Sequence, residues 1–496
     1  NEIGIRLRAT QQNPSVLPAE SLYAIEHDTM DTTFRSMYQG LYIYLSARKE
    51  RRDLLLSQRP PRFDESLDSM ISRSEDDFTR IALKAKAAQD YFLLIGPPGT
   101  GKTSCALKKM VETFHADKDA QILLLSYTNR AVDEICKSLA SIAPAVDFIR
   151  VGSELSCDEA YRGHLIENEL SSCNRRSEVY ERIRNCRIIV GTVAAISGKP
   201  ELFRLKHFDV AIIDEATQIL EPQLLGILCA RGEDGKDAID KFVLIGDHKQ
   251  LPAVVQQNTE QSAIYDESLL SIGLTNLKDS LFERLYRNCT ATVHRSYDML
   301  CRQGRMHPEV ALFANRAFYG GRLIPVGLPH QIESSDTICR LAFYPSVPEK
   351  AGASAKINYS EARIVAGLAV RIYEDHQTDF DESRTLGIIT PYRSQIALIK
   401  KEIESLGIPA LNRILVDTVE RFQGSERDVI IYSFCVNYPY QLKFLSNLTE
   451  EEGVLIDRKL NVALTRARKQ MFITGVPELL ERNPLYKSLL KLIESF

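Results

Sequence analysis

The stretch that decides the fold is Gly96-Pro-Pro-Gly-Thr-Gly-Lys-Thr103, which follows the apolar run 91–95 and precedes a helical pattern. It satisfies the pattern G-x-x-x-x-G-K-[ST] in the order strand, loop, helix. Its glycines let the backbone curl so that N–H groups face an anion, and the helix start adds the positive end of its dipole. The stretch therefore predicts a phosphate-binding loop between a buried strand and a helix.

Two side chains of this loop have specific expected roles. Lys102 is expected to reach the β and γ phosphates of a nucleotide, and Thr103 to hold Mg²⁺ through its hydroxyl. A Gly-Pro loop without a ligand is the alternative, and it is disfavoured because every fixed position of the pattern is matched. The residues expected to line the phosphate site are Gly96, Pro97, Pro98, Gly99, Thr100, Gly101, Lys102, Thr103 and Ser104.

Two further polar segments follow predicted strands. The run 208–213 ends in Asp214 and Glu215, and the run 241–245 ends in Gly246-Asp-His-Lys-Gln-Leu-Pro252. Ligands bind at the carboxyl ends of strands in open α/β sheets. We expect Asp214 to bind Mg²⁺, Glu215 to orient or deprotonate the attacking water, and Gln250 to sense the γ-phosphate. An Asp-Glu pair alone is often a helix cap, but the phosphate loop upstream favours the catalytic interpretation.

Composition limits the class of protein. The 496 residues suggest roughly two to four domains, and 44% hydrophobic with 26% charged residues is typical of soluble globular proteins. A net charge of −4 means that a nucleic-acid partner would be met by a local groove. The sequence contains no apolar run long enough to predict a membrane span. The scattered cysteines lack a C-x-x-C pair and indicate a reduced, intracellular protein, cytoplasmic or, in a eukaryote, nuclear.

The predicted fold class is α/β, with two tandem units of parallel sheet flanked by helices. Short apolar runs alternate with helical patterns twice along the chain. We expect a helical accessory arm or stalk over 1–78, a first unit over 79–290 with a polar helical insertion at about 152–186, and a second unit over 291–496. The Pro-, Gly- and Ser-rich stretch 320–357 predicts irregular connection. The predicted strands are 91–95, 121–126, 187–190, 208–213, 241–245, 386–390, 415–418, 429–433 and 470–474.

Taken in order, the motifs resemble those of the superfamily 1 helicases, of the Upf-like branch. The resemblance implies two RecA-like domains, a nucleotide in the cleft between them, and a single strand running across their tops with 5′-to-3′ polarity. Beyond the three stretches above it rests on Ser126-Tyr-Thr-Asn-Arg-Ala-Val-Asp133, Gly191-Thr192, Gln303-Gly-Arg-Met-His-Pro308, Thr390-Pro-Tyr-Arg-Ser-Gln395, Val416-Asp-Thr-Val-Glu-Arg-Phe-Gln-Gly-Ser-Glu426 and Leu460-Asn-Val-Ala-Leu-Thr-Arg-Ala-Arg468.

The resemblance also implies roles for residues of the second unit. Arg305 and Arg466 are similar to the two arginines that stabilise charge on the γ-phosphate in the transition state, and Glu426 to the residue that binds the ribose. The implied catalytic side chains are Lys102, Glu215, Gln250, Arg305 and Arg466. Loop capping is the alternative for each implied strand contact, and these contacts are Thr128, Asn129, Thr192, Pro391, Tyr392, Thr418 and Arg421.

The chain departs from the family pattern at both usual contacts to the base. Gly304 stands where the family often has a stacking tyrosine, and the stretch before the phosphate loop offers no well-placed glutamine. We therefore expect relaxed nucleotide choice, unless a ring such as Tyr286 or Tyr297 compensates.

The predicted function is that of an ATP- and Mg²⁺-dependent helicase or translocase on single-stranded nucleic acid, with DNA slightly favoured over RNA. A stimulated ATPase that remodels complexes, or an ATP-gated clamp, is the alternative, because motifs do not distinguish movement from unwinding. A catalytically dead scaffold is disfavoured because the phosphate-contacting residues are all intact. The chain begins at Asn1, so we expect that fused domains can lie upstream.

Overall fold

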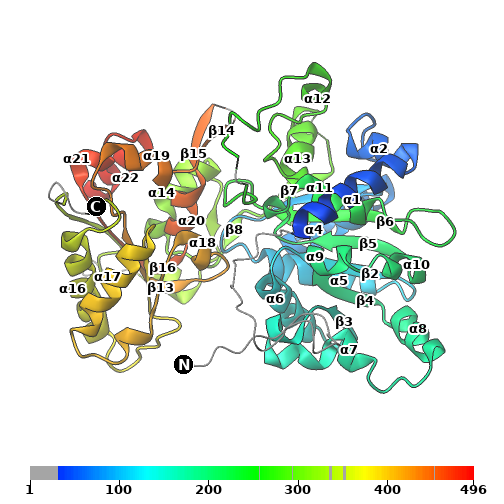
Figure 1. The fold of residues 1–496 in the computed structure, drawn as a ribbon, viewed down its shortest axis with the longest axis horizontal. Coiled ribbons are helices and arrows are strands. Elements are labelled where there is room, and N and C mark those ends of the chain that lie inside the picture. The colour runs from blue at the N-terminus through cyan, green and yellow to red at the C-terminus, as the bar shows by residue number, and fades with distance from the viewer. Residues whose placement is uncertain (1–31, 256, 293, 334–337, 350–353, 452) are drawn as a thin grey trace, which may run out of the picture.

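The computed structural model describes residues 32–496 except 256, 293, 334–337, 350–353 and 452 (Figure 1). Much of the predicted arm, 1–31, lies outside these residues. The described part of the arm is helical, with α1 (Thr32–Ser46), α2 (Lys49–Leu55) and α3 (Asp68–Arg73). Helix α1 packs on α11 (Glu221–Leu228), where Gly40 and Gly226 let the two backbones approach closely.

The first unit is built on a seven-stranded sheet in which every pairing is parallel. In spatial order the strands are β3 (Ile149–Val151), β4 (Ile188–Thr192), β2 (Ile122–Ser126), β5 (Phe208–Ile213), β6 (Ile239–Gly246), β1 (Tyr91–Ile95) and β7 (Tyr297–Met299). Carboxyl ends of parallel strands meet at one edge, so the loops after β1, β2, β4, β5 and β6 all open on the same side of the sheet.

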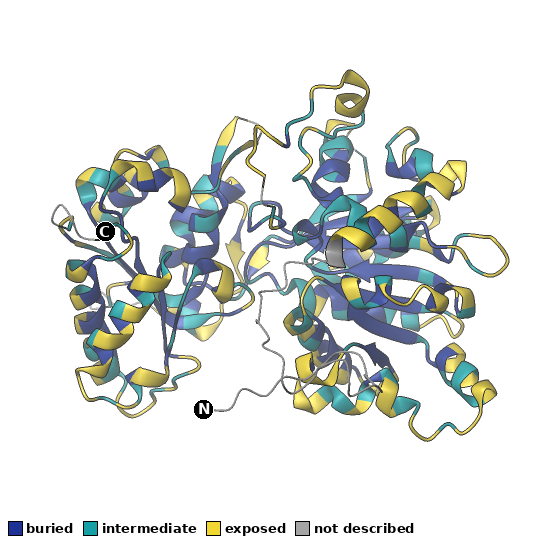
Figure 2. Cartoon of the chain, viewed as in Figure 1, coloured by how far each residue is buried: buried dark blue, intermediate teal, exposed yellow. Residues whose placement is uncertain are grey.

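Continuous apolar runs form these strands because both faces of the sheet are covered. In β1, Tyr91, Leu93 and Ile95 belong to one core, while Phe92 and Leu94 belong to the other. The alternation follows from the two-residue period of a strand. One face packs against α4 (Asp77–Ala87), α5 (Lys108–His115) and α6 (Asn129–Ala140), and the other against α9 (Val193–Ser197), α11 and α13 (Leu281–Ala291). Figure 2 shows the sheet as a buried band between more exposed helices.

The second unit contains a five-stranded sheet, again with parallel pairings throughout. Helices α14 (Pro308–Tyr319), α20 (Arg458–Leu464) and α22 (Pro484–Glu494) pack on one face, and α16 (Tyr359–Asp375) and α17 (Arg393–Glu404) on the other. The strand order is β10 (Leu341–Pro345), β16 (Ala467–Gly475), β13 (Arg427–Ser433), β11 (Leu386–Ile389) and β12 (Leu415–Asp417).

The structure confirms the α/β class and each predicted strand, some with shifted ends. Among the described residues, seven further strands were not predicted. Four of them form two small two-stranded sheets, β8 (Arg302–Gln303) with β9 (Ile324–Pro325) and β14 (Leu448–Glu451) with β15 (Val454–Asp457), while β3, β7 and β10 are edge strands of the two large sheets. Strand β7 follows the predicted boundary at 290/291 but pairs with β1, so the first sheet extends to Met299. Strand β10 lies inside 320–357, which the sequence predicts to be irregular, and pairs with β16. Both are edge strands, and neither carries the uniformly buried apolar pattern that marks the central strands.

The predicted insertion is helical where it is described. It contains α7 (Ile166–Glu169) and α8 (Arg176–Asn185), preceded by short 3₁₀ turns. Arg182 of α8 bridges Asp147 and Glu169, which fixes the insertion to the first unit. Among the described residues, no helix is both long and apolar enough to span a bilayer.

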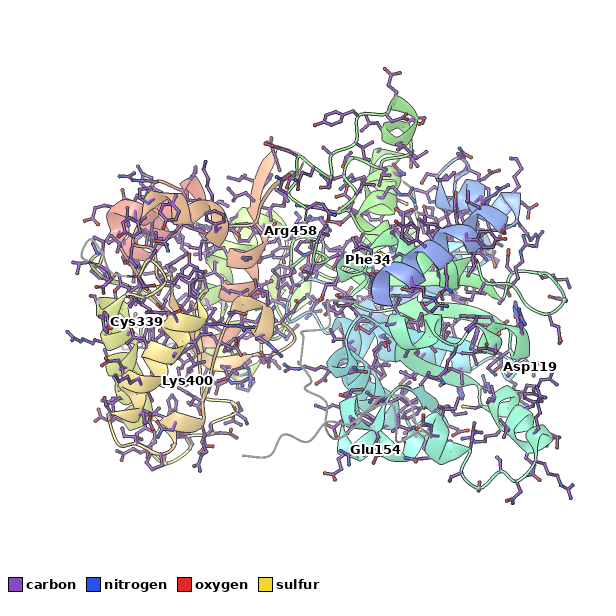
Figure 3. All side chains as sticks on the ribbon, in the orientation of Figure 1. Phe34, Asp119, Glu154, Cys339, Lys400 and Arg458 are labelled. Atoms are coloured by element: carbon purple, nitrogen blue, oxygen red, sulfur yellow. The ribbon has the colours of Figure 1, made fainter. Side chains whose placement is uncertain are left out.

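The two units touch through charged and polar contacts. Arg458, at the start of α20 and labelled between the two halves in Figure 3, donates from Nη2 to Oε1 of Glu283 in α13 at 2.6 Å, and both side chains are buried. Arg130 of α6 reaches the carbonyl oxygen of Gly424 in the second unit at 3.4 Å. Leu251, from the loop after β6, packs into the core of the second unit. The loops at the carboxyl edge of the first sheet are therefore held against the second unit.

Candidate active site

The phosphate loop adopts an anion-cradling conformation. Gly99 and Gly101 both have a φ of +74°, which glycine adopts without the steric cost of a side chain. The helix that follows begins with wide π-type turns over Lys102–Leu107, and the N–H groups of Cys105 and Ala106 both donate to the Gly101 carbonyl at 2.9 Å. N–H groups in the first turn of a helix have no partner within it. The N–H groups at the very start of this helix are therefore the ones to which a phosphate would bind.

The other loop residues complete the turn. The hydroxyl of Thr100 donates to the Pro97 carbonyl at 2.7 Å and fixes the bend through Pro98. A side chain at Gly96 would lie 2.7 Å from Cβ of Lys102, so this position admits only glycine without a shift of the lysine. Ser104 is exposed at the start of the helix.

Lys102 and Thr103 lie against the two carboxylates that follow β5. The Lys102 ammonium is 2.8 Å from Oε1 of Glu215, and the Thr103 hydroxyl donates to Oδ2 of Asp214 at 2.5 Å. Glu215 has a φ of +55°, a left-handed conformation that is costly for a residue with a side chain. The turn directs its carboxylate toward Lys102, while Gln218 donates to the other oxygen at 2.7 Å.

Burial and charge set the protonation of this cluster. Burial acts to lower the pKa of Lys102, but the carboxylates of Glu215 and Asp214 outweigh it and raise that pKa. Burial raises the pKa of Asp214 despite the opposing effect of Lys102. For Glu215 burial also acts upward, but the Lys102 ammonium outweighs it and the pKa is lowered. Lys102 is therefore charged and Glu215 ionised at neutral pH.

Gln250 lies between the first unit and the second. Its Nε2 donates to Oδ2 of Asp247 at 2.7 Å, and its Oε1 accepts from Nη2 of Arg466 at 3.2 Å. Asp247 Oδ2 also accepts from the hydroxyl of Tyr319 in α14 at 2.7 Å. That hydroxyl in turn accepts from Nδ2 of Asn461 in α20 at 2.8 Å. The loop after β6 is thus connected to two helices of the second unit.

Both arginines expected from the family pattern reach this region. Arg466 is buried, with 2% of its surface exposed; burial, together with the charge of Arg305, lowers its pKa to about 9. Arg305 donates from Nε to Oε2 of Glu426 at 2.5 Å and from Nη1 to the Thr465 carbonyl at 3.2 Å. Glu426, the expected ribose contact, is therefore paired with an arginine in this arrangement.

A backbone hydrogen bond joins the phosphate loop to the segment that carries Arg305. The N–H of Gly304 donates to the Gly99 carbonyl at 2.8 Å, and Cβ of Arg305 fills the space beside Gly99 where a side chain would clash. The Arg305 backbone is further held by Gln303, whose Oε1 accepts its N–H at 3.0 Å, and by His330, whose Nε2 lies 2.8 Å from its carbonyl oxygen. All five predicted catalytic residues thus lie in one connected cluster at the junction of the two units.

Comparisons with known proteins agree with this architecture. Models of an AAA domain match residues 277–478 and, in two overlapping pieces, residues 73–179 and 166–258. The DNA replication ATP-dependent helicase/nuclease DNA2 of Gallus gallus is 28% identical over 507 residues, covering 96% of this chain and 45% of the relative. The DNA polymerase alpha-associated DNA helicase A of Saccharomyces cerevisiae is 24% identical over 535 residues, covering 92% of this chain and 73% of the relative. The chain belongs to the superfamily 1 helicases, in their Upf-like branch.

This superfamily 1 chain spans about half the length of the DNA2 relatives: the Homo sapiens protein is 28% identical over 540 residues, and the match covers 96% of this chain and 46% of that protein. Among solved structures, the complex of arterivirus nonstructural protein 10 (helicase) with DNA aligns with a TM-score of 0.41 at 15% identity, covering 82% of this chain and 65% of that chain.

In this superfamily 1 chain, the residues expected to contact single-stranded nucleic acid lie at the carboxyl ends of β-strands. Thr128 follows β2 and Thr192 is the last residue of β4. Their hydroxyl oxygens cap α6 and α9 by accepting from the N–H groups of Ala131 and Ala195 at 3.2 and 3.1 Å. The capping role named as the alternative is thus present. It uses an acceptor lone pair and leaves the hydroxyl hydrogen available to a phosphate.

In the second unit the candidates occupy two neighbouring strand ends. Pro391 and Tyr392 follow β11, and Thr418 follows β12, with Arg421 one helical turn later and exposed. The Tyr392 hydroxyl accepts from Nε2 of Gln441 at 3.1 Å. Asn129, the first residue of α6, completes the set.

The surroundings of Gly304 are aliphatic. A Cβ at this position would lie 3.2 Å from Leu328 Cδ1 and 3.4 Å from Val326 Cγ2. Tyr286 and Tyr297, the rings named above as substitutes for the stacking tyrosine, instead pack edge to face with each other at 5.6 Å and against the core of the first unit. The structure therefore shows these rings engaged in packing.

Sequence reasoning missed Asp247, Tyr319 and Asn461 as parts of the site. Asp247 stands inside a quoted motif but looked like an ordinary turn residue, and Asn461 inside another. Tyr319 lies at the end of a helix with no motif to mark it. Its hydroxyl reaches the site only because α14 and α20 pack side by side on the second sheet.

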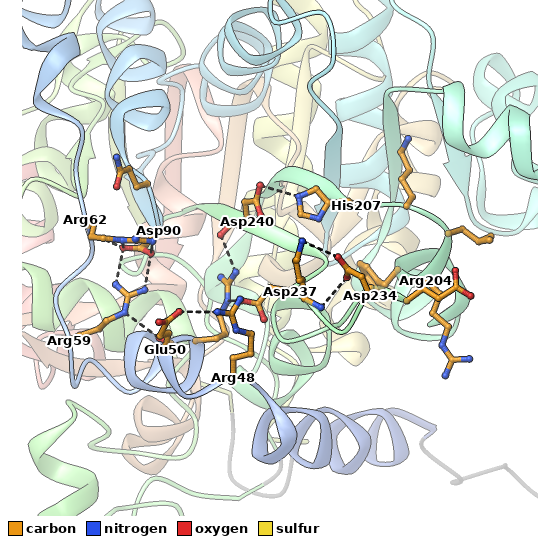
Figure 4. Close-up of a pocket in the computed structure, with 18 residues that line it drawn as sticks. Arg48, Glu50, Arg59, Arg62, Asp90, Arg204, His207, Asp234, Asp237 and Asp240 are labelled. Atoms are coloured by element: carbon orange, nitrogen blue, oxygen red, sulfur yellow. Dashed lines mark hydrogen bonds and ion pairs between the residues drawn. The ribbon is translucent and has the colours of Figure 1, made fainter.

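A cavity lies at the opposite edge of the first sheet. It has a volume of about 760 Å³ and is lined by Asp90, His207 and Asp240, from the amino ends of β1, β5 and β6 (Figure 4). Arg59 and Arg62 both donate to Asp90, and His207 lies 3.0 Å from Asp240. The cavity is separate from the candidate active site because it lies at the other edge of the sheet. Since these charged groups pair with one another, we assign the cavity no chemistry.

Proposed function

We propose that the chain hydrolyses ATP at the junction of its two units and uses the cycle to move along single-stranded nucleic acid. The observation that carries this proposal is the hydrogen bond from Arg466 in the second unit to Gln250 in the first. Gln250 belongs to the same sheet edge as Lys102 and Glu215. A change at the γ-phosphate would therefore be transmitted directly to the other unit, which is what a cleft-closing motor requires.

The donor set fits Mg²⁺ bound together with a nucleotide. Thr103 and Asp214 supply a hydroxyl and a carboxylate 2.5 Å apart, and Mg²⁺ takes such oxygen ligands with the rest supplied by phosphate and water. When bound, the ion would neutralise charge on the β and γ phosphates. Thr103 and Asp214 would then exchange their mutual hydrogen bond for contacts to it.

The protein's own side chains have separate tasks in this proposal. Lys102 would leave Glu215 and pair with the β and γ phosphates, which frees the Glu215 carboxylate to accept a proton from water. Arg305 would leave Glu426 and, together with Arg466, face the charge that develops on the γ-phosphate. Glu426 would then be free to accept from ribose hydroxyls. Each phosphate-directed cation thus has an internal partner that holds it before the nucleotide enters.

We propose single-stranded DNA as the strand, with 5′-to-3′ movement and unwinding of duplexes. The DNA names of the relatives support this choice, and hydroxyl, amide and backbone contacts suit phosphate and sugar with little sequence preference. The test is strand displacement on duplexes with either a 5′ or a 3′ single-stranded tail. We expect displacement of the 5′-tailed duplex only. ATP hydrolysis stimulated by single strands without displacement of either duplex would favour the remodeller or clamp.

We propose relaxed nucleotide choice, because Gly304 and its aliphatic neighbours Val326 and Leu328 present no stacking ring or polar group to a base. Loss of one aromatic stack costs on the order of 1–3 kcal/mol in comparable base contacts. That loss is shared by all four bases, and no well-placed glutamine precedes the phosphate loop to distinguish adenine. We therefore expect kcat/KM for GTP, CTP and UTP within about tenfold of that for ATP, or about 1.4 kcal/mol. A preference for ATP of a hundredfold or more, measured under the same conditions, would contradict this.

The organisation of the whole protein follows as a proposal. We propose that residues up to about 78 form an arm, that 79–290 extended by β7 form the first domain, and that the second runs to residue 496. The DNA2 relatives carry additional segments beyond the matched region, and we propose fused domains upstream of Asn1. An intracellular location fits the DNA replication named for those relatives.

A further inference from the structure

An aromatic cluster lies beside the candidate strand contacts of the second unit. Tyr392 follows β11, while Tyr438, Tyr440 and Phe444 follow β13. The two strands are parallel neighbours, with Ile389 opposite Tyr432. Their carboxyl ends therefore meet at one sheet edge, which brings rings distant in sequence together.

The outer rings of this cluster are exposed. Phe444 has 72% of its surface exposed and Tyr440 has 54%. The rings of Tyr438 and Tyr440 stack with centroids 5.7 Å apart and planes inclined by 15°. Tyr438 thus packs against Tyr440, while Phe444 lies one helical turn after Tyr440 in the helical segment 439–445, so the two exposed rings are neighbours on the surface. Exposed aromatic rings of this kind are the surface on which a nucleobase stacks.

A buried polar network holds the rings in place. Oε1 of Gln441 accepts from the N–H groups of Asn437 and Tyr438 at 2.8 and 2.9 Å. Its Nε2 donates to the Ala355 carbonyl at 2.7 Å and to the Tyr392 hydroxyl at 3.1 Å. Asn437 and Gln441 are both buried. One amide side chain therefore positions Tyr392 and the segment that carries Tyr438 and Tyr440, and less conformational entropy is lost when a ligand binds a surface fixed in advance.

We propose that Tyr440 and Phe444 form a stacking platform for the bases of a single strand, which extends the path that begins at Tyr392. This inference rests on the proposed function, since it takes Tyr392 to lie beside the strand. The sheet edge is continuous from Tyr392 to Tyr440, and the exposed cations Arg393 and Lys443 flank the rings, where they can meet phosphates. The platform binds any base, because every base offers a π-face.

The test separates base stacking from phosphate contact. Binding of the whole chain is measured by fluorescence anisotropy to an oligothymidylate and to an abasic oligomer of equal length, with wild type and the Tyr440→Ala/Phe444→Ala variant. Wild type should prefer the oligomer with bases. The double variant should lose about tenfold to a hundredfold in affinity for oligothymidylate and keep its affinity for the abasic oligomer.

Two further variants show that any loss belongs to the platform. Tyr265→Ala removes a ring that is 82% exposed in the first unit, and it should leave both affinities unchanged. The single variant Tyr440→Phe keeps the ring and should retain the wild-type affinity for both oligomers. An unchanged Tm of the double variant shows that it is folded.

Three results would count against the platform. Wild-type affinity of the double variant for oligothymidylate overturns it, and the rings then become a docking surface for another protein. An equal loss for both oligomers also overturns it, because the rings would then act through phosphate or structure. Failure of the wild-type chain to bind either oligomer overturns the proposed function, and the platform with it.

Discussion

Replacing Arg305 by alanine should lower kcat for ATP hydrolysis about 10³-fold, the lower end of what an arginine facing the γ-phosphate supplies. Arg305 stands beside the phosphate loop because Gly304 donates to the Gly99 carbonyl at 2.8 Å. Its guanidinium, held by Glu426, needs only to exchange one anionic partner for another. The measurement is the steady-state rate at saturating ATP and saturating single-stranded DNA.

Arg468→Ala is the matched control for this prediction. Arg468 also lies near Glu426, with Nε 3.7 Å from Oε1, and it contacts Asp428 at 3.5 Å. Removing it changes the same local charge without removing a group expected at the phosphate, so most of kcat should remain. Equal losses in the two variants would mean that Arg305 acts by holding the segment around Glu426, and its assignment to the γ-phosphate would be wrong.

Replacing Glu215 by glutamine should lower kcat about 10²- to 10⁴-fold while leaving nucleotide binding intact, as expected for loss of a general base. Lys102 lowers the pKa of Glu215 despite its burial. The carboxylate is therefore ionised at neutral pH before the nucleotide enters, so Glu215 is already in the form that accepts a proton from water. Single-turnover hydrolysis and binding of a fluorescent nucleotide measure the two effects separately.

Glu233→Gln makes the same chemical change at the opposite edge of the first sheet, beside the separate cavity. It should leave both the rate and the nucleotide affinity unchanged. Turnover near the wild-type rate in Glu215→Gln would refute the assignment of the base. Loss of binding in that variant would instead show that Glu215 is needed to hold Lys102 and the loop in place.

The sequence was sufficient to predict the parts of the site that depend on strand ends. Lys102, Asp214 and Gln250 each follow an apolar run, and parallel strands bring their carboxyl ends to one edge whatever the details of packing. The contact from Tyr319 to Asp247 could not be predicted in this way. It depends on how α14 lies on the second sheet, which no local pattern records.

The strand assignments show the same limit. Central strands such as β1 have continuous apolar runs because helices cover both faces of the sheet. At the edges, β7 has only three residues and both β7 and β10 are partly exposed, so their sequences resemble loops and the sequence-based boundary came before β7. The pairing of Arg305 with Glu426 could not be predicted either, because the roles that the family pattern implies for these residues are those with a nucleotide bound.

The central claim is that nucleotide hydrolysis at the junction of the two units responds to a single strand bound across them. Its most direct test is the steady-state rate of ATP hydrolysis by the chain with and without single-stranded DNA, with Lys102→Ala as the baseline. We predict that the strand raises the wild-type rate about tenfold or more, in line with the gain expected when closure completes a catalytic site, and that Lys102→Ala shows no activity in either condition. Wild-type hydrolysis that is the same with and without a strand, or no greater than that of Lys102→Ala, would contradict the account.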